Sequence, residues 1–281
     1  MSMMITPLPV NRDLILGSLS KGVRSDGRRL DEYRPIKFEF NVISKANGSA
    51  SVRIGDTYVL VGVKAEIGKP FPDTPDEGVL IVNSEFVPLA SPQFEAGPPD
   101  ENSIELARVI DRGLRHGGAV DFKDLCIIPN EKVWILWVDI YVLDHGGDLF
   151  DATALASMAA LMVTKIPVVV VEGSQIVVRE EKRPLKIVDY PVSVTINKIG
   201  NYLLLDPTLE ELELVEARLT MFTNSKGEIC AVQKGLPGAF TYDEVMKSVE
   251  LAKSKGRELR SILLESFNNW DKNVRGALNG V

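Results

Sequence analysis

The chain has 281 residues, with 32 basic and 39 acidic side chains and a formal net charge of -7. This balance excludes a protein that coats polyanions in general, so any nucleic-acid site has to be local. No run approaches the roughly 18 apolar residues of a membrane span, and Met1–Val10 lacks a secretory signal, which predicts a soluble, cytoplasmic protein. Cys126 and Cys230 do not form a close pair, which predicts core thiols rather than disulfides or a thiolate metal site.

The chain is predicted to begin with a short helix and continue as a meander of strands. Asn11-Arg12-Asp13 offers N-cap chemistry to a helix that includes Leu14–Leu16. Asn47-Gly48 and Gly55-Asp56 are strong turn signals between strand-like runs. The predicted strands are Ile36–Ile43, Ser49–Ile54 and Thr57–Ile67, followed by a proline-rich loop over Gly68–Gly78 and a strand over Val79–Val87.

Two helices and a central strand complete the first half of the chain. One helix is predicted from about Asp100 to Arg115. Val133–Leu143 has apolar residues on both faces of the expected strand, which predicts a strand that is covered on both sides. An alanine-rich helix is then predicted over Leu149–Lys165, ended by Pro167 before the strand Val168–Val171.

The second half repeats the order of strands followed by helices. Glu180–Pro184 is charged and ends in proline, which predicts a linker. A long amphipathic helix is predicted from Thr241 to about Trp270, with Thr241 and Glu244 as a capping box. The other predicted elements are strands over Val192–Lys198 and Tyr202–Leu205, a helical turn within Glu210–Glu216, and a hairpin of Ala217–Thr223 with Glu228–Gln233. The fold class is therefore α+β, with an extension over residues 1–30 and domains over residues 31–179 and 180–281.

A dense group of ionisable residues surrounds the predicted turn between the central strand and the alanine-rich helix. Its members are Asp139, Asp144, His145, Asp148 and Asp151. Taken alone, the group indicates a divalent metal site or an acid/base centre. We favour the alternative that Asp148, after Gly146-Gly147, caps the free N–H groups at the helix N-terminus. No metal or cofactor is therefore predicted.

Two groups of arginines could contact phosphates. Arg108, Arg112 and Arg115 share one face of a predicted helix, opposite Leu106, Ile110 and Leu114. From the residues alone, a solvated face with Glu101, Glu105 and Asp111 as partners is favoured over a phosphate grip. The segment Arg24–Arg28 holds an Asp-Gly turn between two arginines and fits a structural ion-pair knot better than a phosphate-binding nook.

Several segments, taken in order along nearly the whole chain, resemble the RNase PH family. They are Arg24–Arg28, Gly55–Val63, Val109–Arg115 and Asp148–Ala152. More narrowly, Asp148–Ala152 and Leu205–Thr208 with Glu210-Glu211 resemble the non-catalytic RNase PH-like ring subunit of the archaeal exosome. The resemblance implies two similar βαβα halves with helices packed on mixed sheets. It also implies a six-membered ring whose active members shorten RNA from its 3′ end by phosphorolysis.

Departures from the family pattern predict that this chain is catalytically silent. Where active members carry Gly-Gly-Thr-Arg to bind the attacking phosphate, this chain has Gly146-Gly147-Asp148-Leu149. Active members also carry two carboxylates six residues apart. Alignment on Asp206 and Glu210-Glu211 puts Leu212 and Arg218 at these two positions in this chain. Loss of both groups should abolish phosphorolysis, because residues that act as a unit fail together. Arg112 and Arg115 match arginines that family members present to RNA, so the resemblance now favours a functional stripe, with Arg108 as its least certain member.

The sequence thus predicts a non-catalytic exosome subunit that structures the active site of a partner and helps to bind single-stranded RNA. The partners that the resemblance implies are an active RNase PH-like subunit, paired three times to form a hexameric ring, and RNA-binding cap subunits. One alternative is an autonomous phosphate-dependent exoribonuclease that uses the acidic group. Another is an RNA-binding module unrelated to degradation.

Overall fold

The computed structural model describes residues 12–172 and 175–278. The predicted cap residue Asn11 lies outside these residues. The elements of the first half are α1 (Arg12–Leu19), β1 (Ile36–Phe40), β2 (Gly48–Ile54), β3 (Thr57–Gly68), β4 (Val79–Phe86), α2 (Glu101–His116), a 3-10 turn (Lys123–Leu125), β5 (Cys126–Ile128), β6 (Lys132–Asp144), α3 (Phe150–Met162), β7 (Lys165–Glu172) and β8 (Gln175–Pro184). Those of the second half are β9 (Val192–Ile199), β10 (Tyr202–Leu205), α4 (Leu209–Leu212), β11 (Ala217–Thr223), β12 (Ile229–Gly235) and α5 (Tyr242–Leu278).

Two sheets, one from each half, carry the fold. The first has the order β1-β2-β3-β6-β4, with β5 also paired to β6, and its only parallel pair within the described residues is β4 with β6. The second is antiparallel and has the order β10-β9-β11-β12. Each half runs strands, helix, strands, helix, so the predicted α+β fold of two similar βαβα halves is confirmed.

Helix α3 joins the two halves. It packs on β2 and β3 of the first sheet and on β9 of the second, and Phe150–Leu161 are buried throughout. Its alanines allow close approach to both sheets. The helix ends at Met162, before the predicted end at Lys165, because Lys165 already pairs with Pro184 in the β7–β8 ribbon.

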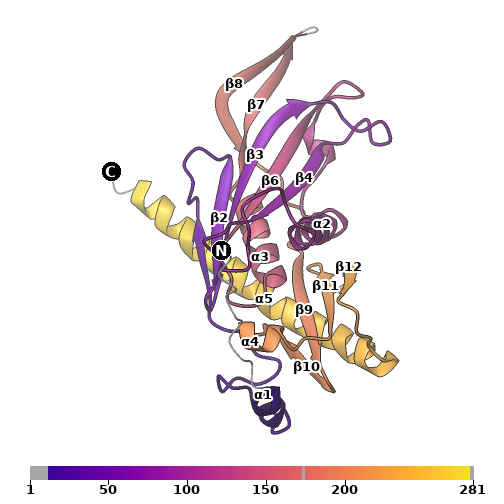
Figure 1. The fold of residues 1–281 in the computed structure, drawn as a ribbon. Coiled ribbons are helices and arrows are strands. Elements are labelled where there is room, and N and C mark those ends of the chain that lie inside the picture. Colours follow the sequence, from indigo (N-terminus) through magenta and orange to yellow (C-terminus); the bar gives the residue numbers. More distant parts are fainter. Residues whose placement is uncertain (1–11, 173–174, 279–281) are drawn as a thin grey trace.

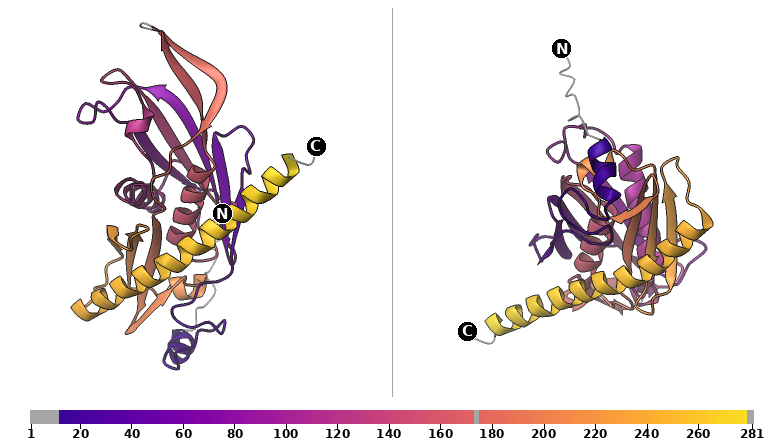
Figure 2. Two further views of the ribbon diagram at one scale, coloured as in Figure 1. Left: turned by 180° about the vertical axis from the view of Figure 1, so that it is seen from behind. Right: turned by 90° about the horizontal axis from the view of Figure 1, so that it is seen from below.

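The long helix α5 crosses the back of both halves (Figure 2). It packs against β9 and β11, and near its C-terminal end Phe267 and Trp270 contact Phe40 of β1 with ring centroids 5.8 and 5.4 Å apart. The helix continues beyond the predicted end near Trp270 to Leu278, and this last part projects from the body. None of the described helices is both long and apolar enough to cross a membrane.

Some expectations for the strands are corrected. The predicted linker Glu180–Pro184 is instead the second half of β8, which pairs with β7 in a ribbon that projects from the body (Figure 1). The first strand ends at Phe40 rather than Ile43, because Asn41 has a positive φ of 56°. In β6 one face is fully buried and the other only half-buried, so the predicted cover on both faces is incomplete. Cys126 and Cys230 are half-buried rather than core thiols.

Candidate functional site

A cavity at the junction of the halves brings together the two predicted degenerate motifs. Gly147, Asp148 and Leu149 reach it from the turn between β6 and α3, Leu212 from the end of α4, and Arg218 from the start of β11. The cavity measures about 250 Å³. The two motifs are more than sixty residues apart in the chain, and the packing of α3 between the sheets places them on one wall.

Asp148 caps helix α3, as predicted. Its Oδ1 accepts hydrogen bonds from the backbone N–H groups of Phe150, at 3.0 Å, and Asp151, at 3.5 Å. The residue is only 4% exposed. In a phosphate-binding turn these N–H groups would face an anion. Here they are already bonded to a side chain of the chain itself.

The environment of Asp148 opposes its ionisation. Burial raises the pKa of this carboxyl group well above its usual range, and the charges of Asp151 and Asp206 and a hydrogen bond with Asp151 raise it further. An ionised carboxylate at this position would also repel a phosphate. The raised pKa means that exclusion of an anion depends on the occupied N–H donors more than on the charge of Asp148.

The glycine turn is fixed by contacts with the second half. Gly147 has a φ of +140° and forms an isolated β-bridge with Thr208. A Cβ atom on Gly147 would lie 2.0 Å from the carbonyl oxygen of Pro207. The carbonyl oxygen of Gly146 accepts a 2.6 Å hydrogen bond from Arg34 Nη1. The turn therefore has a structural role independent of phosphate binding.

Arg218, the second residue of the predicted degenerate acid pair, lies on the wall of the cavity. Its guanidinium carbon lies 4.1 Å from the ring centroid of Phe150, and its Nη2 donates to Glu105 Oε2 at 2.8 Å. Leu212 adds a half-buried apolar side chain at the end of α4. Neither side chain can accept a proton from a reacting group or hold a cation.

The other members of the acidic group do not assemble with Asp148 into a metal site within the described residues. Asp151 is buried, and it accepts hydrogen bonds from the hydroxyls of Tyr33, Ser193 and Thr195 at 2.6, 2.6 and 2.9 Å. These contacts tie α3 to the second sheet. Within residues 12–172 and 175–278 no group of three or more His, Cys, Asp and Glu is placed to hold a metal ion.

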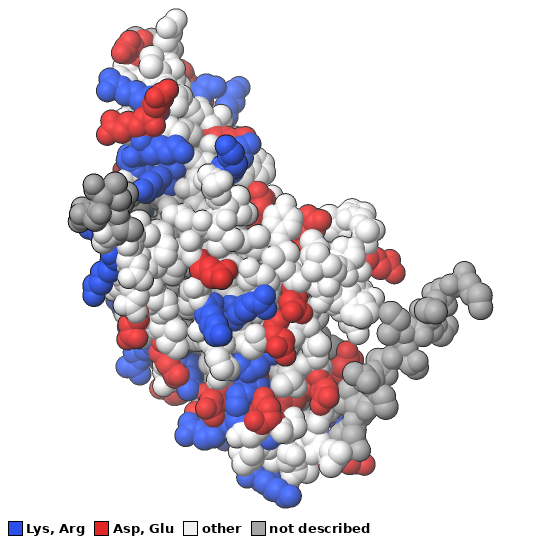
Figure 3. All heavy atoms as spheres, turned by 90° about the vertical axis from the view of Figure 1, so that its left-hand side faces the viewer, with Lys and Arg blue, Asp and Glu red and all other residues white. Residues whose placement is uncertain are grey.

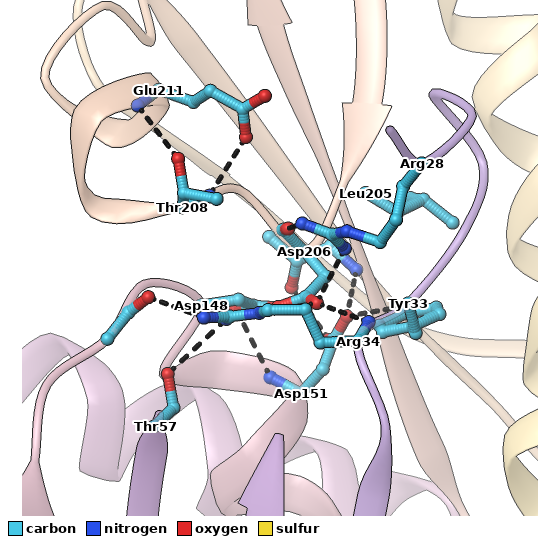
Figure 4. Close-up of polar contacts among 12 residues, drawn as sticks. Arg28, Tyr33, Arg34, Thr57, Asp148, Asp151, Leu205, Asp206, Thr208 and Glu211 are labelled. Carbon is cyan, nitrogen blue, oxygen red and sulfur yellow. Dashed lines mark hydrogen bonds and ion pairs between the residues drawn. The ribbon is translucent and has the colours of Figure 1, made fainter. Parts of the chain in front are cut away.

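An ion-pair network beside the cavity confirms the predicted arginine knot (Figure 4). Arg24 is 2% exposed, donates from Nε to Glu211 at 2.9 Å, and also pairs with that carboxylate through Nη2. Arg28 and Arg34 converge on Asp206, at 2.9 and 2.5 Å. Sequence reasoning missed Arg34, which no motif contains.

The arginine stripe lies on a separate surface. Arg108, Arg112 and Arg115 line one hollow together with Leu80–Val82 of the edge strand β4, while the opposite face of α2 is buried as predicted. Arg108 and Arg112 are exposed. Arg115 is half-buried and pairs with Asp111 at 2.7 Å and with the carbonyl oxygen of Leu80 at 2.8 Å.

Charge elsewhere is mixed. On the face shown in Figure 3, basic and acidic side chains are interspersed, in agreement with the formal net charge of -7. This face offers no continuous basic surface. The arginine hollow itself is confined to one face of α2 and to the neighbouring strand β4.

Two α+β halves joined through a buried helix, with a glycine turn at their junction, define an RNase PH-like protein. The model of the 3′ exoribonuclease family, domain 1, matches residues 32–167, and that of domain 2 matches residues 189–255. The chain therefore belongs to the 3′ exoribonuclease family.

Archaeal proteins are among its relatives. The exosome complex component Rrp42 of Methanopyrus kandleri is 50% identical over 252 residues, which cover 89% of this chain and 94% of that protein. Its counterpart from Thermococcus gammatolerans is 51% identical over 262 residues, covering 92% and 96%. The chain of a solved structure described as the Archaeoglobus fulgidus exosome with RNA bound to the active site has a TM-score of 0.83 and 47% identity, covering 89% of this chain and 96% of that one. Rice Rrp46, at 16% identity and a TM-score of 0.64, shows the fold alone.

Proposed function

We propose that this chain is a non-catalytic subunit of an exosome ring that degrades RNA from its 3′ end. The observation that carries the proposal is the state of the junction cavity. Asp148 occupies the N–H donors that a phosphate needs, and Arg218 is stacked and ion-paired where a carboxylate is needed. Phosphorolysis requires both groups together, so the cavity cannot support it.

The proposal assigns RNA guidance to the arginine hollow. Arg108 and Arg112 present exposed guanidinium groups above the edge strand β4, and Arg115 lies beside them, fixed by Asp111. Arginine contacts to phosphates do not depend on base sequence, which suits a subunit that feeds many RNAs to a partner. The geometry supports Arg108 and Arg112 as the RNA-contacting members and Arg115 as the residue that anchors the helix beneath them.

The proposed assembly pairs this chain with an active RNase PH-like subunit, three pairs closing a hexameric ring with RNA-binding cap subunits on one face. The support is that relatives about half identical over nearly their whole length are named exosome complex components. Solved chains that this one resembles along most of its length come from archaeal exosomes. In such a ring the arginine hollow would complete the RNA groove of the partner.

Co-expression with the active homologue of the same organism tests the proposal. Each protein and the complex are incubated with single-stranded RNA and inorganic phosphate, and released nucleoside diphosphates are measured. We expect none from this chain alone, and faster release from the complex than from the partner alone. Nucleoside diphosphates released by the isolated chain would instead support an autonomous exoribonuclease.

A second arm separates RNA guidance from simple RNA binding. The complex is rebuilt with Arg108→Ala and Arg112→Ala together, and its mass is checked. We expect an intact ring that degrades RNA more slowly. Unchanged degradation by an intact ring would refute the guiding role.

A further inference from the structure

One wall of the junction cavity is formed by the aromatic rings of Phe86, Phe94 and His145, which have no role in binding phosphate or in acid chemistry. The ring centroids of Phe86 and Phe94 are 4.8 Å apart, and those of Phe94 and His145 are 5.4 Å apart with planes only 16° from parallel. All three residues line the cavity and are half-buried. Half-buried aromatic side chains of this kind can stack on a planar ligand.

The charges around the cavity disfavour an anion. The Arg218 guanidinium already pairs with Glu105, and the N–H groups at the start of α3 already donate to Asp148. A phosphate would have to displace one of these carboxyl groups. A strongly basic ligand would meet Arg218 itself. An uncharged ligand avoids both conflicts.

Neutral hydrogen-bonding groups complete the wall. The amides of Gln93 and Asn102 line the cavity, and each carries a donor beside an acceptor. The Nδ1 atom of His145 is buried without a hydrogen-bond partner among the described residues. Burial, and then the charge of Arg34, lower the pKa of His145, so its ring is held neutral. Amide side chains of this type pair with the adjacent amino group and ring nitrogen of adenine.

The size of the cavity limits the ligand further. At about 250 Å³ it is smaller than the roughly 300–1,000 Å³ of pockets that enclose drug-sized molecules. We propose that this cavity binds one small, uncharged, planar heteroaromatic group with a donor beside an acceptor, such as the base of adenosine. The inference rests on the proposed function in one respect, namely that the cavity carries no phosphate chemistry.

Isothermal titration of the full chain with adenosine tests this binding site. We expect saturation at one adenosine per chain, no saturable binding of inorganic phosphate, and no loss of adenosine affinity when phosphate is added. Absence of saturable adenosine binding, or displacement of adenosine by phosphate, would overturn the proposal. Phosphorolysis is assayed separately, so activity of the isolated chain would refute the proposed function without deciding nucleoside binding.

Two matched variants locate the binding to the aromatic wall. Phe94→Leu keeps an apolar side chain but removes the stacking face, and we expect at least a roughly tenfold loss of adenosine affinity. Phe71→Leu changes a 49% exposed aromatic residue on the loop between β3 and β4, outside the cavity, and should leave the affinity unchanged. Equal affinities for both variants would place binding elsewhere and overturn the proposal.

The planar heteroaromatic group that binds in the cavity could be the base of a free nucleoside or a base of an RNA strand. A short oligoadenylate added to the adenosine titration distinguishes these sources. Competition indicates that the cavity accepts a base of a strand, whereas binding of adenosine without competition indicates a free nucleoside. Both results are consistent with the proposed binding site, provided that Phe94→Leu weakens the binding of adenosine.

Discussion

Arg218 lies with its guanidinium carbon 4.1 Å from the ring centroid of Phe150 while its Nη2 donates to Glu105 at 2.8 Å. The three residues come from β11, α3 and α2, so this one side chain connects the second sheet to helices α2 and α3 of the first half. Arg218, which the family resemblance aligns with a carboxylate of active members, therefore stabilises the junction.

Replacement of Arg218 should therefore reduce stability. Arg218→Ala removes a partly buried cation–π contact and an ion pair, and we expect the free energy of unfolding to fall by about 1–2 kcal/mol. Arg218→Lys should be intermediate, because an ammonium can pair with Glu105 but lacks the planar stack. Urea unfolding measures both, with exposed Arg108→Ala as the control. An Arg218→Ala variant with the same free energy of unfolding as the wild type would contradict this role.

The glycine turn allows a steric prediction with a matched control. Gly147→Ala places a Cβ atom 2.0 Å from the Pro207 carbonyl oxygen, whereas Gly118 also has a positive φ, +67°, with nothing within 4 Å of its Cβ position. Gly118→Ala should cost about 1–2 kcal/mol from backbone conformation alone. Gly147→Ala should cost more, by about another 1–3 kcal/mol, because the chain must move apart at the β-bridge with Thr208. Equal losses in thermal unfolding would show that the turn is not tightly packed.

The buried pair of Arg24 and Glu211 should be strongly coupled. Arg24→Met leaves the Glu211 carboxylate buried without its guanidinium partner, and we expect a loss of about 3–5 kcal/mol in the free energy of unfolding. The double variant with Glu211→Gln should lose less than the sum of the single variants, because no unpaired charge remains. Lys64→Met, at an exposed pair with Glu66, is the control and should leave the unfolding midpoint unchanged. Additive losses would mean that the pair is not coupled.

The arginine hollow predicts different defects for neighbouring residues. Arg112→Ala should weaken RNA binding by the assembled complex and reduce the slope of log affinity against log salt by about 1, with normal stability. Arg115→Ala should instead lower the unfolding midpoint of the isolated chain, because it removes the hydrogen bond to the Leu80 carbonyl oxygen that joins α2 to β4, and also the ion pair with Asp111 within α2. Identical effects of the two variants on both measurements would refute this division.

Local patterns predicted most of the elements and one part of the site. The buried strands and α3 follow from apolar composition, and the Asp148 cap follows from a Gly-Gly-Asp turn before a helix. The strand predicted over Val168–Val171 is part of β7, but its partner β8 was missed, because β8 is exposed at nearly every position and so has no apolar period. A strand without a buried face resembles a linker in sequence.

Long-range contacts could not be predicted from local patterns. Arg24 and Glu211 are 187 residues apart, and nothing in either segment indicates the partner. The family resemblance did align Leu212 and Arg218 with a lost acid pair, and the structure places both on the cavity wall with Asp148. It gave no indication of Phe86, Phe94 and Gln93, because these residues reach the cavity from β4 and an irregular loop without a motif.

The raised pKa of the Asp148 carboxyl group gives a prediction for the pH dependence of stability. The pKa of this carboxyl group is raised well above the ordinary value of 3.8 by burial and by the charges of Asp151 and Asp206. The folded state therefore holds this proton more tightly than the unfolded state does. The contribution of Asp148 to stability is complete below the unfolded pKa and is lost as the pH rises through the folded pKa.

Asp148→Asn keeps a side-chain oxygen to cap α3 and removes this titration. We expect the difference in the free energy of unfolding, variant minus wild type, to become more positive from about pH 4 towards neutral pH. Urea unfolding at several pH values measures the difference, and the comparison cancels the titration of other carboxyl groups that both proteins share. Asp26→Asn is a control of opposite sign, since hydrogen bonds with Arg28 lower the pKa of Asp26 against the opposing effect of burial. A difference for Asp148→Asn that stays constant or falls with pH would mean that Asp148 is ionised in the folded protein, and exclusion of phosphate would then include charge repulsion at the turn.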